Sequence, residues 1–571
     1  MPAHSLSCDS SSILDQPNTG PGAGPRETRK ASLVMAGVSV FAVLLRLSFW
    51  AYTHRTWEDA LITVQHAENA ARGLGFTHVP GGPRIHGFTS PISVLIPLLG
   101  ELAHPGFGLP LLRLVSAICG GITVWIAMRI SQRLGLAFPM TLLIGGYLAI
   151  EHQQILFGMA GMETQVAVTV LLLSIYSLFD LKPIHVGISL GLCMLARPDF
   201  AFWVVIAIAI VAWRCWIRND LRPLEAIGLA QLLIYGPWLA FTTWYYGSPL
   251  PNTVLAKSWG YANRWYAGMS PEQFLAMVGH RIRYTFSVLG PVYGGNGAGD
   301  GFLPIDPHGV ICCIVLIFVV LGMLVAMRKK GLPGLAIAGF ILVYSFYYLF
   351  LMISVFRWYT VPLAAVSILA AGIGFDSALK ACVPARWSLV AGYSVAAAYL
   401  MSLAMVAPAT FRGEKNVQAF VEDAGRKQIG LYLASVMAPK QTLGCEALGY
   451  FGYYSRHEVF DYPGLCNWQV VQFLHRHPTR RNPQEMLRYF HPDYLILRPF
   501  EYEIGLKKGG HWLLDEYEMI ADFRVPDERR SQLLFPHQNI DLEYYVLRRK
   551  SIRPEGHSYV GPSDHEPRAG F

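Results

Sequence analysis

The chain has 571 residues, of which 53% are hydrophobic and only 15% are charged, and its mean hydropathy is +0.35. A soluble domain usually carries about 25% charged residues, so the composition excludes an ordinary soluble protein and predicts an integral membrane protein. The net charge of +8 does not indicate nucleic-acid binding, because the Lys and Arg residues gather at the ends of apolar runs, where they set membrane topology.

The N-terminal segment, residues 1–31, is rich in Ser, Pro, Gly and Asp and has no packing pattern. This composition predicts a disordered tail. The segment is too polar, and too long before the first apolar run, for a cleavable signal peptide. The run from Ser32 to Tyr52 is therefore predicted to be a retained signal anchor.

Apolar runs follow along the chain, most of them near the roughly 20 residues that cross a bilayer. The basic residues between them fall on one side if the N-terminus is cytoplasmic. An odd number of spans then places the C-terminal part on the outer side. We predict eleven spans: 32–53, 109–130, 139–157, 164–181, 184–197, 200–217, 224–246, 310–327, 332–354, 358–379 and 387–408.

Between the spans, the predicted outer segments are unequal in length, with a tight loop at 158–163, whereas the cytoplasmic loops are all short. Loops 54–108 and 247–309 are the longest, and Pro91–Ala103 within the first is apolar but too short for an ordinary span. We expect a re-entrant or interfacial helix there. Span 184–197 is also short, and it is predicted to form a hairpin with the span that follows it.

Residues 411–571 form a predicted small α/β domain outside the membrane. Arg412–Met437 has helical spacing, and three short apolar runs bounded by Gly, Pro and charge are typical of strands: Thr442–Tyr454, Tyr494–Leu497 and Tyr544–Leu547. Cys445 and Cys466 lie in this part, where an oxidising compartment would let them pair. The sequence alone leaves that pairing open.

Ionisable residues at the predicted outer boundary are the candidates for chemistry, because such groups are costly at membrane depth and tend to mark function. A sugar transfer from a lipid phosphate needs a base for the acceptor hydroxyl and cations for the phosphate. The candidates are Glu58, Asp59, His86, Glu163, Arg197, Asp199, Lys257 and Arg357.

Each candidate also has a simpler interpretation. Glu58 and Asp59 are adjacent acids that would suit a wet loop or the first turn of a helix running to about Arg72. Arginines at the boundary often snorkel to the membrane surface, and His86 lies in a sequence typical of a turn. No His or Glu pair has the spacing of a metal site.

The order of these elements resembles the GT-C class of membrane glycosyltransferases, and within it the branch that contains the mycobacterial terminal arabinofuranosyltransferase AftB. The resemblance covers roughly residues 32–410. The motifs that carry it are Trp57-Glu58-Asp59-Ala60-Leu61-Ile62, Gly87-Phe88-Thr89-Ser90-Pro91, Gly161-Met162-Glu163-Thr164, Arg197-Pro198-Asp199, Tyr245-Tyr246-Gly247 to Lys257, and Arg357-Trp358-Tyr359.

This resemblance implies a polytopic helical fold and an inverting transfer from a polyprenyl-phosphate sugar to a cell-envelope glycan or lipid. The reaction would take place on the outer face of a bacterial cytoplasmic membrane. By the same resemblance, Asp59 is the base and Glu58 orients the acceptor, although the family pair is usually Asp-Asp or Asp-Glu. Some members need a divalent metal, for which this sequence shows no site.

The resemblance also assigns the remaining candidates. The two arginines are implied to contact the donor phosphate, and the lysine is a weaker candidate for the same role. The other three would position substrate. The assignments are Arg197, Arg357 and Lys257 for phosphate, and Glu163, Asp199 and His86 for positioning.

Other functions stay open at this point. A transporter or flippase of lipid-linked substrates would place functional charges at mid-membrane and show related halves, and the sequence shows no such halves. A non-catalytic partner in envelope synthesis would not need the acidic pair. Within enzymes, an oligosaccharide polymerase or ligase is the alternative.

Overall fold

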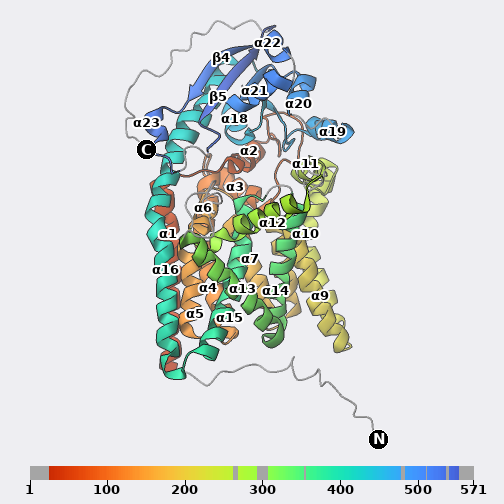
Figure 1. Ribbon diagram of the computed structural model, residues 1–571. Coiled ribbons are helices and arrows are strands. Elements are labelled where there is room, and N and C mark those ends of the chain that lie inside the picture. The colour runs from red at the N-terminus through yellow and green to blue at the C-terminus, as the bar shows by residue number, and fades with distance from the viewer. Residues whose placement is uncertain are drawn as a thin grey trace.

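A bundle of long apolar helices carries a smaller α/β domain at one end in this computed structural model (Figure 1). The structure describes residues 25–260, 268–291, 307–352, 355–477, 483–508, 511–534 and 539–551. The predicted tail up to residue 24 and most of the Gly-rich part of loop 247–309 lie outside these residues. The first helix begins at Pro25, inside the predicted tail.

Eight helical segments in the described part of the chain are long and apolar enough to cross a membrane, or nine if the bent pair α6–α7 is one span. The protein is therefore a multi-pass integral membrane protein. The helices in these segments are α1 (Pro25–Thr53), α4 (Gly108–Arg133), α9 (Ala201–Ile217), α10 (Arg222–Tyr246), α13 (Pro307–Lys329), α14 (Gly331–Phe346), α15 (Arg357–Cys382) and α16 (Ala385–Asn416).

Eleven spans were predicted, one of them short, and the difference from the eight or nine of the structure arises in the middle of the bundle. The predicted span 139–157 breaks at Glu151, whose carboxylate caps a new helix by accepting from the backbone N–H groups of Gln153 and Gln154 at 2.9 and 2.8 Å. A bend of 115° follows between α6 and α7. At 1.5 Å per residue, helices this short do not cover the roughly 30 Å apolar core. They are α5 (Phe138–Ile150), α6 (His152–Met159), α7 (Thr164–Ser177) and α8 (Pro183–Ala196).

Two shorter helices lie between the bundle and the α/β domain. Pro91–Ala103 is a helix, α3, as predicted, and the Ser90 hydroxyl caps it by accepting from the Ser93 N–H at 3.3 Å. The second is α2 (Glu58–Ala71), which packs against α3 and begins with two acids in its first turn. Helices α11 (Asn252–Gly260) and α12 (Pro271–Phe286) come from the other long outer segment.

The α/β domain is built on a five-stranded sheet of order β2-β1-β3-β5-β4. Strand β1 is parallel to β2 and β3, whereas β5 is antiparallel to both of its neighbours. Leu443, Leu495 and Val546 are fully buried in its core. The strands are β1 (Thr442–Cys445), β2 (Glu458–Asp461), β3 (Tyr494–Leu497), β4 (Tyr517–Arg524) and β5 (Glu543–Arg549). The helices that follow β1 in the chain are α18 (Leu448–Ser455), α19 (Trp468–Arg476), α20 (Pro483–Phe490), α21 (Pro499–Lys508), α22 (Trp512–Glu516) and α23 (Asp527–Arg530).

The prediction of one strand over Thr442–Tyr454 was wrong beyond Cys445. The chain turns there into α18, because its glycine-rich face packs directly on α2, which a strand could not do without losing that contact. A Cβ at Gly449 would collide with the Glu58 backbone oxygen. Cys445 and Cys466 are both free thiols, and Cys466 instead points its Sγ at the Gly87 carbonyl at 3.6 Å.

The long helix α16 joins the two parts. It runs the height of the bundle beside α1 and continues through the π-helical segment η4 (Val417–Arg426) and α17 (Lys427–Val436) into the α/β domain (Figure 1). Buried Arg55, just after α1, pairs with Glu414 at 3.0 Å and with Glu422 at 3.1 Å. Breaking a buried pair by removing one partner costs about 3–5 kcal/mol, so these pairs hold the α/β domain on the bundle.

Candidate active site

Helix α2 places the acidic pair at the junction of bundle and α/β domain. Glu58 and Asp59 form its first turn, where the helix dipole stabilises negative charge. The helix predicted from Glu58 to about Arg72 is therefore present, and it does not exclude a chemical role. A cavity of about 590 Å³ opens beside it, lined by Asp59 and by the ends of several bundle helices.

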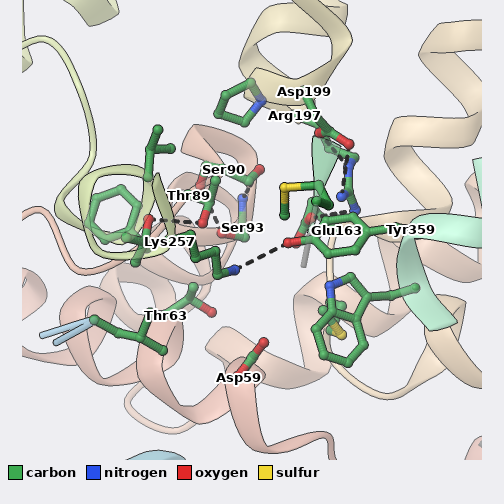
Figure 2. A pocket seen from close by; sticks show the side chains of 18 of the residues that line it. Asp59, Thr63, Thr89, Ser90, Ser93, Glu163, Arg197, Asp199, Lys257 and Tyr359 are labelled. Atoms are coloured by element: carbon green, nitrogen blue, oxygen red, sulfur yellow. Dashed lines mark hydrogen bonds and ion pairs between the residues drawn. The ribbon is translucent and has the colours of Figure 1, made fainter. Parts of the chain in front are cut away.

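The Asp59 carboxylate points into this cavity (Figure 2). Among the described residues, no hydrogen bond or ion pair to that carboxylate is formed. Burial raises the pKa of Asp59, and the nearby Lys257 partly offsets this rise. A carboxylate with a raised pKa and no structural partner has the properties of a general base.

Glu58 is held very differently from its neighbour. Its Oε2 pairs with Arg426 at 3.1 Å, and its Oε1 accepts from the Gly449 N–H at 3.1 Å. Burial raises the pKa of Glu58 to about 8, with the Arg426 charge opposing the rise. Both contacts come from the C-terminal part of the chain, so Glu58 ties α2 to that part.

Three of the predicted residues form one cluster on the opposite wall of the cavity (Figure 2). Arg197 follows the end of α8, where Pro198 begins a short 3₁₀ turn. Its Nε donates to Asp199 at 2.9 Å and its Nη1 to Glu163 at 3.4 Å, while the guanidinium lies 4.9 Å from the centre of the Tyr359 ring. The cluster fixes Arg197 between two carboxylates.

Two tyrosines complete this cluster, one from α14 and one from the π-helical segment Tyr347–Leu351 that follows it. The hydroxyls of Tyr344 and Tyr348 donate to Asp199 Oδ2 at 2.8 and 2.6 Å. Asp199 is therefore occupied by Arg197 and by both hydroxyls. Its position indicates that it orients the guanidinium rather than contacting a ligand directly.

Lys257 lies between the base and this cluster. It reaches the cavity from α11, and its Nζ donates to the Tyr359 hydroxyl at 3.2 Å (Figure 2). Lys257 and Asp59 also line a second cavity of about 490 Å³, on the side of the α/β domain. The first cavity thus collects three carboxylates and two cations from segments far apart in sequence.

Two predicted residues do not line either cavity. Buried Arg357 donates to the Tyr284 carbonyl at 2.8 Å and to the Ser287 hydroxyl at 2.6 Å. His86 stacks on Tyr246 with the ring centres 4.8 Å apart, and burial lowers the pKa of His86 to about 3. The cavity is lined instead by their chain neighbours, Trp358 and Tyr359 after the arginine and Gly87 to Ser90 after the histidine.

Residues of the α/β domain line the second cavity, and sequence reasoning did not single them out. Glu446 and Arg498 are among them, and their side chains pair at 2.7 Å. An acid directly after a buried strand was the available signal for Glu446. In the part of the chain that the structure describes, no group of three or more His, Cys, Asp or Glu side chains is arranged to hold a metal ion.

Comparison with known proteins supports the fold and little beyond it. No curated protein sequence is measurably similar to the chain. The family model "Domain of unknown function (DUF8728)" matches residues 410–540, which is less than half of the chain.

Solved structures share the architecture at low sequence identity. The archaeal oligosaccharyltransferase AglB from Archaeoglobus fulgidus, in complex with an inhibitory peptide and a dolichol-phosphate, is 11% identical; the match covers 82% of this chain and 69% of that one with a TM-score of 0.51. The apo form of the Archaeoglobus fulgidus oligosaccharyltransferase is 12% identical, and the match covers 86% of this chain and 71% of that one with a TM-score of 0.50. ArnT from Cupriavidus metallidurans bound to undecaprenyl phosphate is 14% identical over 90% of this chain and 97% of that one, with a TM-score of 0.48. The fold is GT-C-like, as predicted.

Proposed function

We propose that the protein is an inverting glycosyltransferase that moves a sugar from a polyprenyl-phosphate donor to a hydroxyl of a cell-envelope glycan or lipid. The observation that carries this proposal is the position of Asp59. Its carboxylate, which has no hydrogen bond or ion pair in the described part of the chain, faces a cavity that also holds Lys257 and the Arg197 cluster. A base and cations facing one another across a cavity suit the attack of a hydroxyl on a sugar phosphate.

The chemistry follows from this arrangement. The Asp59 carboxylate takes the proton of the acceptor hydroxyl while its oxygen bonds to the anomeric carbon. The bond from that carbon to the phosphate oxygen breaks, and its electron pair leaves with the polyprenyl phosphate. A single displacement on the face opposite the leaving group inverts the anomeric centre. The raised pKa makes Asp59 a stronger base than an exposed carboxylate.

The cations stabilise the charge that develops on the leaving phosphate. Lys257 is the better placed of the two, because it lines both cavities together with Asp59, whereas Arg197 lines only the first, and because it lowers the pKa of Asp59. Arg197 is partly neutralised by Glu163 and Asp199, which fix its direction. We propose that Arg357 acts indirectly, by holding the first turn of α15 and so the two aromatic residues that follow it.

The lipid part of the donor fits the apolar side of the same cavity. Phe202, Leu351 and Met352 line it near the bundle helices. A prenyl chain in that position would leave its phosphate near Arg197 and Lys257. Apolar lining with a few placed polar groups is the usual character of a ligand site.

The finer assignments stay predictions. They include the arabinofuranosyl branch, the cytoplasmic N-terminus and outer α/β domain, and the bacterial cytoplasmic membrane as location. The division of the chain at residues 31 and 410 also stays a prediction.

The test is Asp59→Asn, assayed by transfer of radiolabelled sugar from polyprenyl phosphates in membranes. A positioned general base contributes about 10²–10⁴-fold, and the isosteric amide breaks no hydrogen bond or ion pair among the residues that the structure describes. We expect the loss of transfer by about that factor with unchanged expression and melting temperature. Full activity of Asp59→Asn would refute the proposed function.

A further inference from the structure

The second cavity has no role in the donor chemistry, although it reaches the same base. It lies between α2, η4 and the α/β domain. Asp59, Ile62, Lys257, Trp358 and Leu465 line both cavities. Asp59 is therefore accessible from two sides, one formed by bundle helices and the other largely by the C-terminal part.

We propose that the second cavity binds the acceptor as an uncharged, polyhydroxylated carbohydrate segment, and that Glu446 accepts hydrogen bonds from hydroxyls next to the one that reacts. This inference rests on the proposed function and names the acceptor class and its site. The donor occupies the first cavity, and the acceptor hydroxyl meets it at Asp59.

Glu446 is positioned for this contact by the end of a strand. It follows β1 directly, and its side chain keeps 39% of its surface exposed. One carboxylate oxygen accepts from Arg498 at 2.7 Å, which orients the group and leaves acceptor capacity for ligand hydroxyls. Glu58, Asp59 and Glu446 all line the second cavity, and the Glu446 charge raises the pKa values of the other two carboxyl groups.

The charges around this cavity disfavour an anionic ligand. Its two arginines from the C-terminal part are already paired with carboxylates. Arg426 contacts Glu58 at 3.1 Å and Asp541 at 2.6 Å, and Arg498 contacts Asp541 at 2.8 Å in addition to Glu446. A phosphate or carboxylate entering here would have to displace a carboxylate from one of these two buried arginines, which is unfavourable because the displaced charge loses its partner.

The remaining wall suits the apolar faces of sugar rings. Phe356 and Trp358 stack with their ring centres 4.6 Å apart, and Trp57 packs edge-on against Trp358 at 5.7 Å. These contacts fix the rings as a rigid surface. Flat aromatic faces beside hydrogen-bonding carboxylates supply the two interactions that a polyhydroxylated ring needs, apolar packing and placed acceptors.

Two variants test the site, each with a matched control. Ile540→Trp fills the cavity from an exposed position, and Leu514→Trp makes the same change on an exposed helix of the same domain outside it. Glu446→Gln keeps an oxygen for Arg498, and Glu503→Gln neutralises an exposed glutamate elsewhere. The probes are radiolabelled polyprenyl-phosphate sugar and short oligosaccharides released from the envelope of a deletion strain, separated into neutral and anionic fractions.

We expect the neutral fraction to accept sugar. Glu446→Gln should raise the KM for it about tenfold or more, as for the loss of a hydrogen bond to a charged group. Ile540→Trp should raise the same KM because the indole occupies the space of the acceptor. The donor KM and both controls should be unchanged. Glu446→Gln should also move the acid limb of the pH–rate profile to lower pH, because the lost charge lets the pKa of Asp59 fall.

Three results would overturn the inference: a change in donor KM instead of acceptor KM, equal effects of the controls, or transfer only to anionic oligosaccharides. Asp59→Asn separates this failure from that of the proposed function. If Asp59→Asn is inactive and the acceptor KM of both test variants is normal, only the acceptor site is wrong. If Asp59→Asn is fully active, the glycosyltransferase proposal itself fails.

Discussion

Replacing Lys257 with methionine tests the electrostatics of the site most directly. The substitution keeps an unbranched side chain that is one heavy atom shorter, and it removes the charge and the hydrogen bond to the Tyr359 hydroxyl. Loss of one charged donor to a developing oxyanion costs about 10²–10³ in kcat, or about 2.7–4 kcal/mol. Arg197 cannot compensate, because Glu163 and Asp199 hold it at 3.4 and 2.9 Å.

The same variant has a second effect whose sign follows from the structure. Lys257 lowers the pKa of Asp59, so Lys257→Met raises it. Because the base acts only when deprotonated, the acid limb of the pH–rate profile should move to higher pH. Lys257→Arg, which retains the charge, should leave the limb near its original position.

The assay is sugar transfer from radiolabelled polyprenyl phosphate over a range of pH with purified protein in detergent. Lys427→Met is the control, because Lys427, the first residue of α17, lies over the Tyr454 ring and lines neither cavity. A Lys257→Met enzyme with kcat within about threefold of the parent, or with an acid limb at lower pH, would refute the assignment of Lys257.

The remaining predictions concern the arginines and the contact of α18 with α2. Arg197→Ala should raise the donor KM by about tenfold or more. Arg357→Ala should mainly lower the melting temperature, because the Arg357 guanidinium donates to the Tyr284 carbonyl and the Ser287 hydroxyl. A larger effect of Arg357→Ala than of Arg197→Ala on the donor KM would refute these two roles. Gly449→Ala should destabilise the protein by about 1–3 kcal/mol and reduce transfer, because the added Cβ meets Glu58. The control Gly425→Ala, whose Cβ would contact only the Phe420 oxygen at 3.9 Å, should behave like the parent in thermal unfolding.

The sequence alone predicted features that depend on local composition. Apolar runs identified the membrane bundle, because transfer of a segment into lipid depends on that segment's own side chains. The strand Tyr494–Leu497 and the helix Pro91–Ala103 were predicted with their observed bounds, since both are apolar runs closed by Pro, Gly or charge. The order of acidic and basic motifs also predicted a GT-C-like fold.

Local composition failed where a contact between distant segments competed with it. The capping carboxylate of Glu151 broke an apolar run that reads as one span. The contact of Gly449 with α2 turned a predicted strand into a helix. A hydropathy value is summed over many residues, so it does not reveal that one of those residues caps a helix or packs against a distant segment.

Only the tertiary structure decided which charged residues share a cavity. Arg197 and Arg357 both follow apolar runs near a predicted outer boundary, yet Arg197 lines the cavity and Arg357 instead donates to the Tyr284 carbonyl of α12. Glu58 and Gly449 meet across 391 positions, and that contact brings Glu446 to the acidic pair. Side-chain direction depends on the packing of neighbouring elements, and a sequence read segment by segment does not contain that packing.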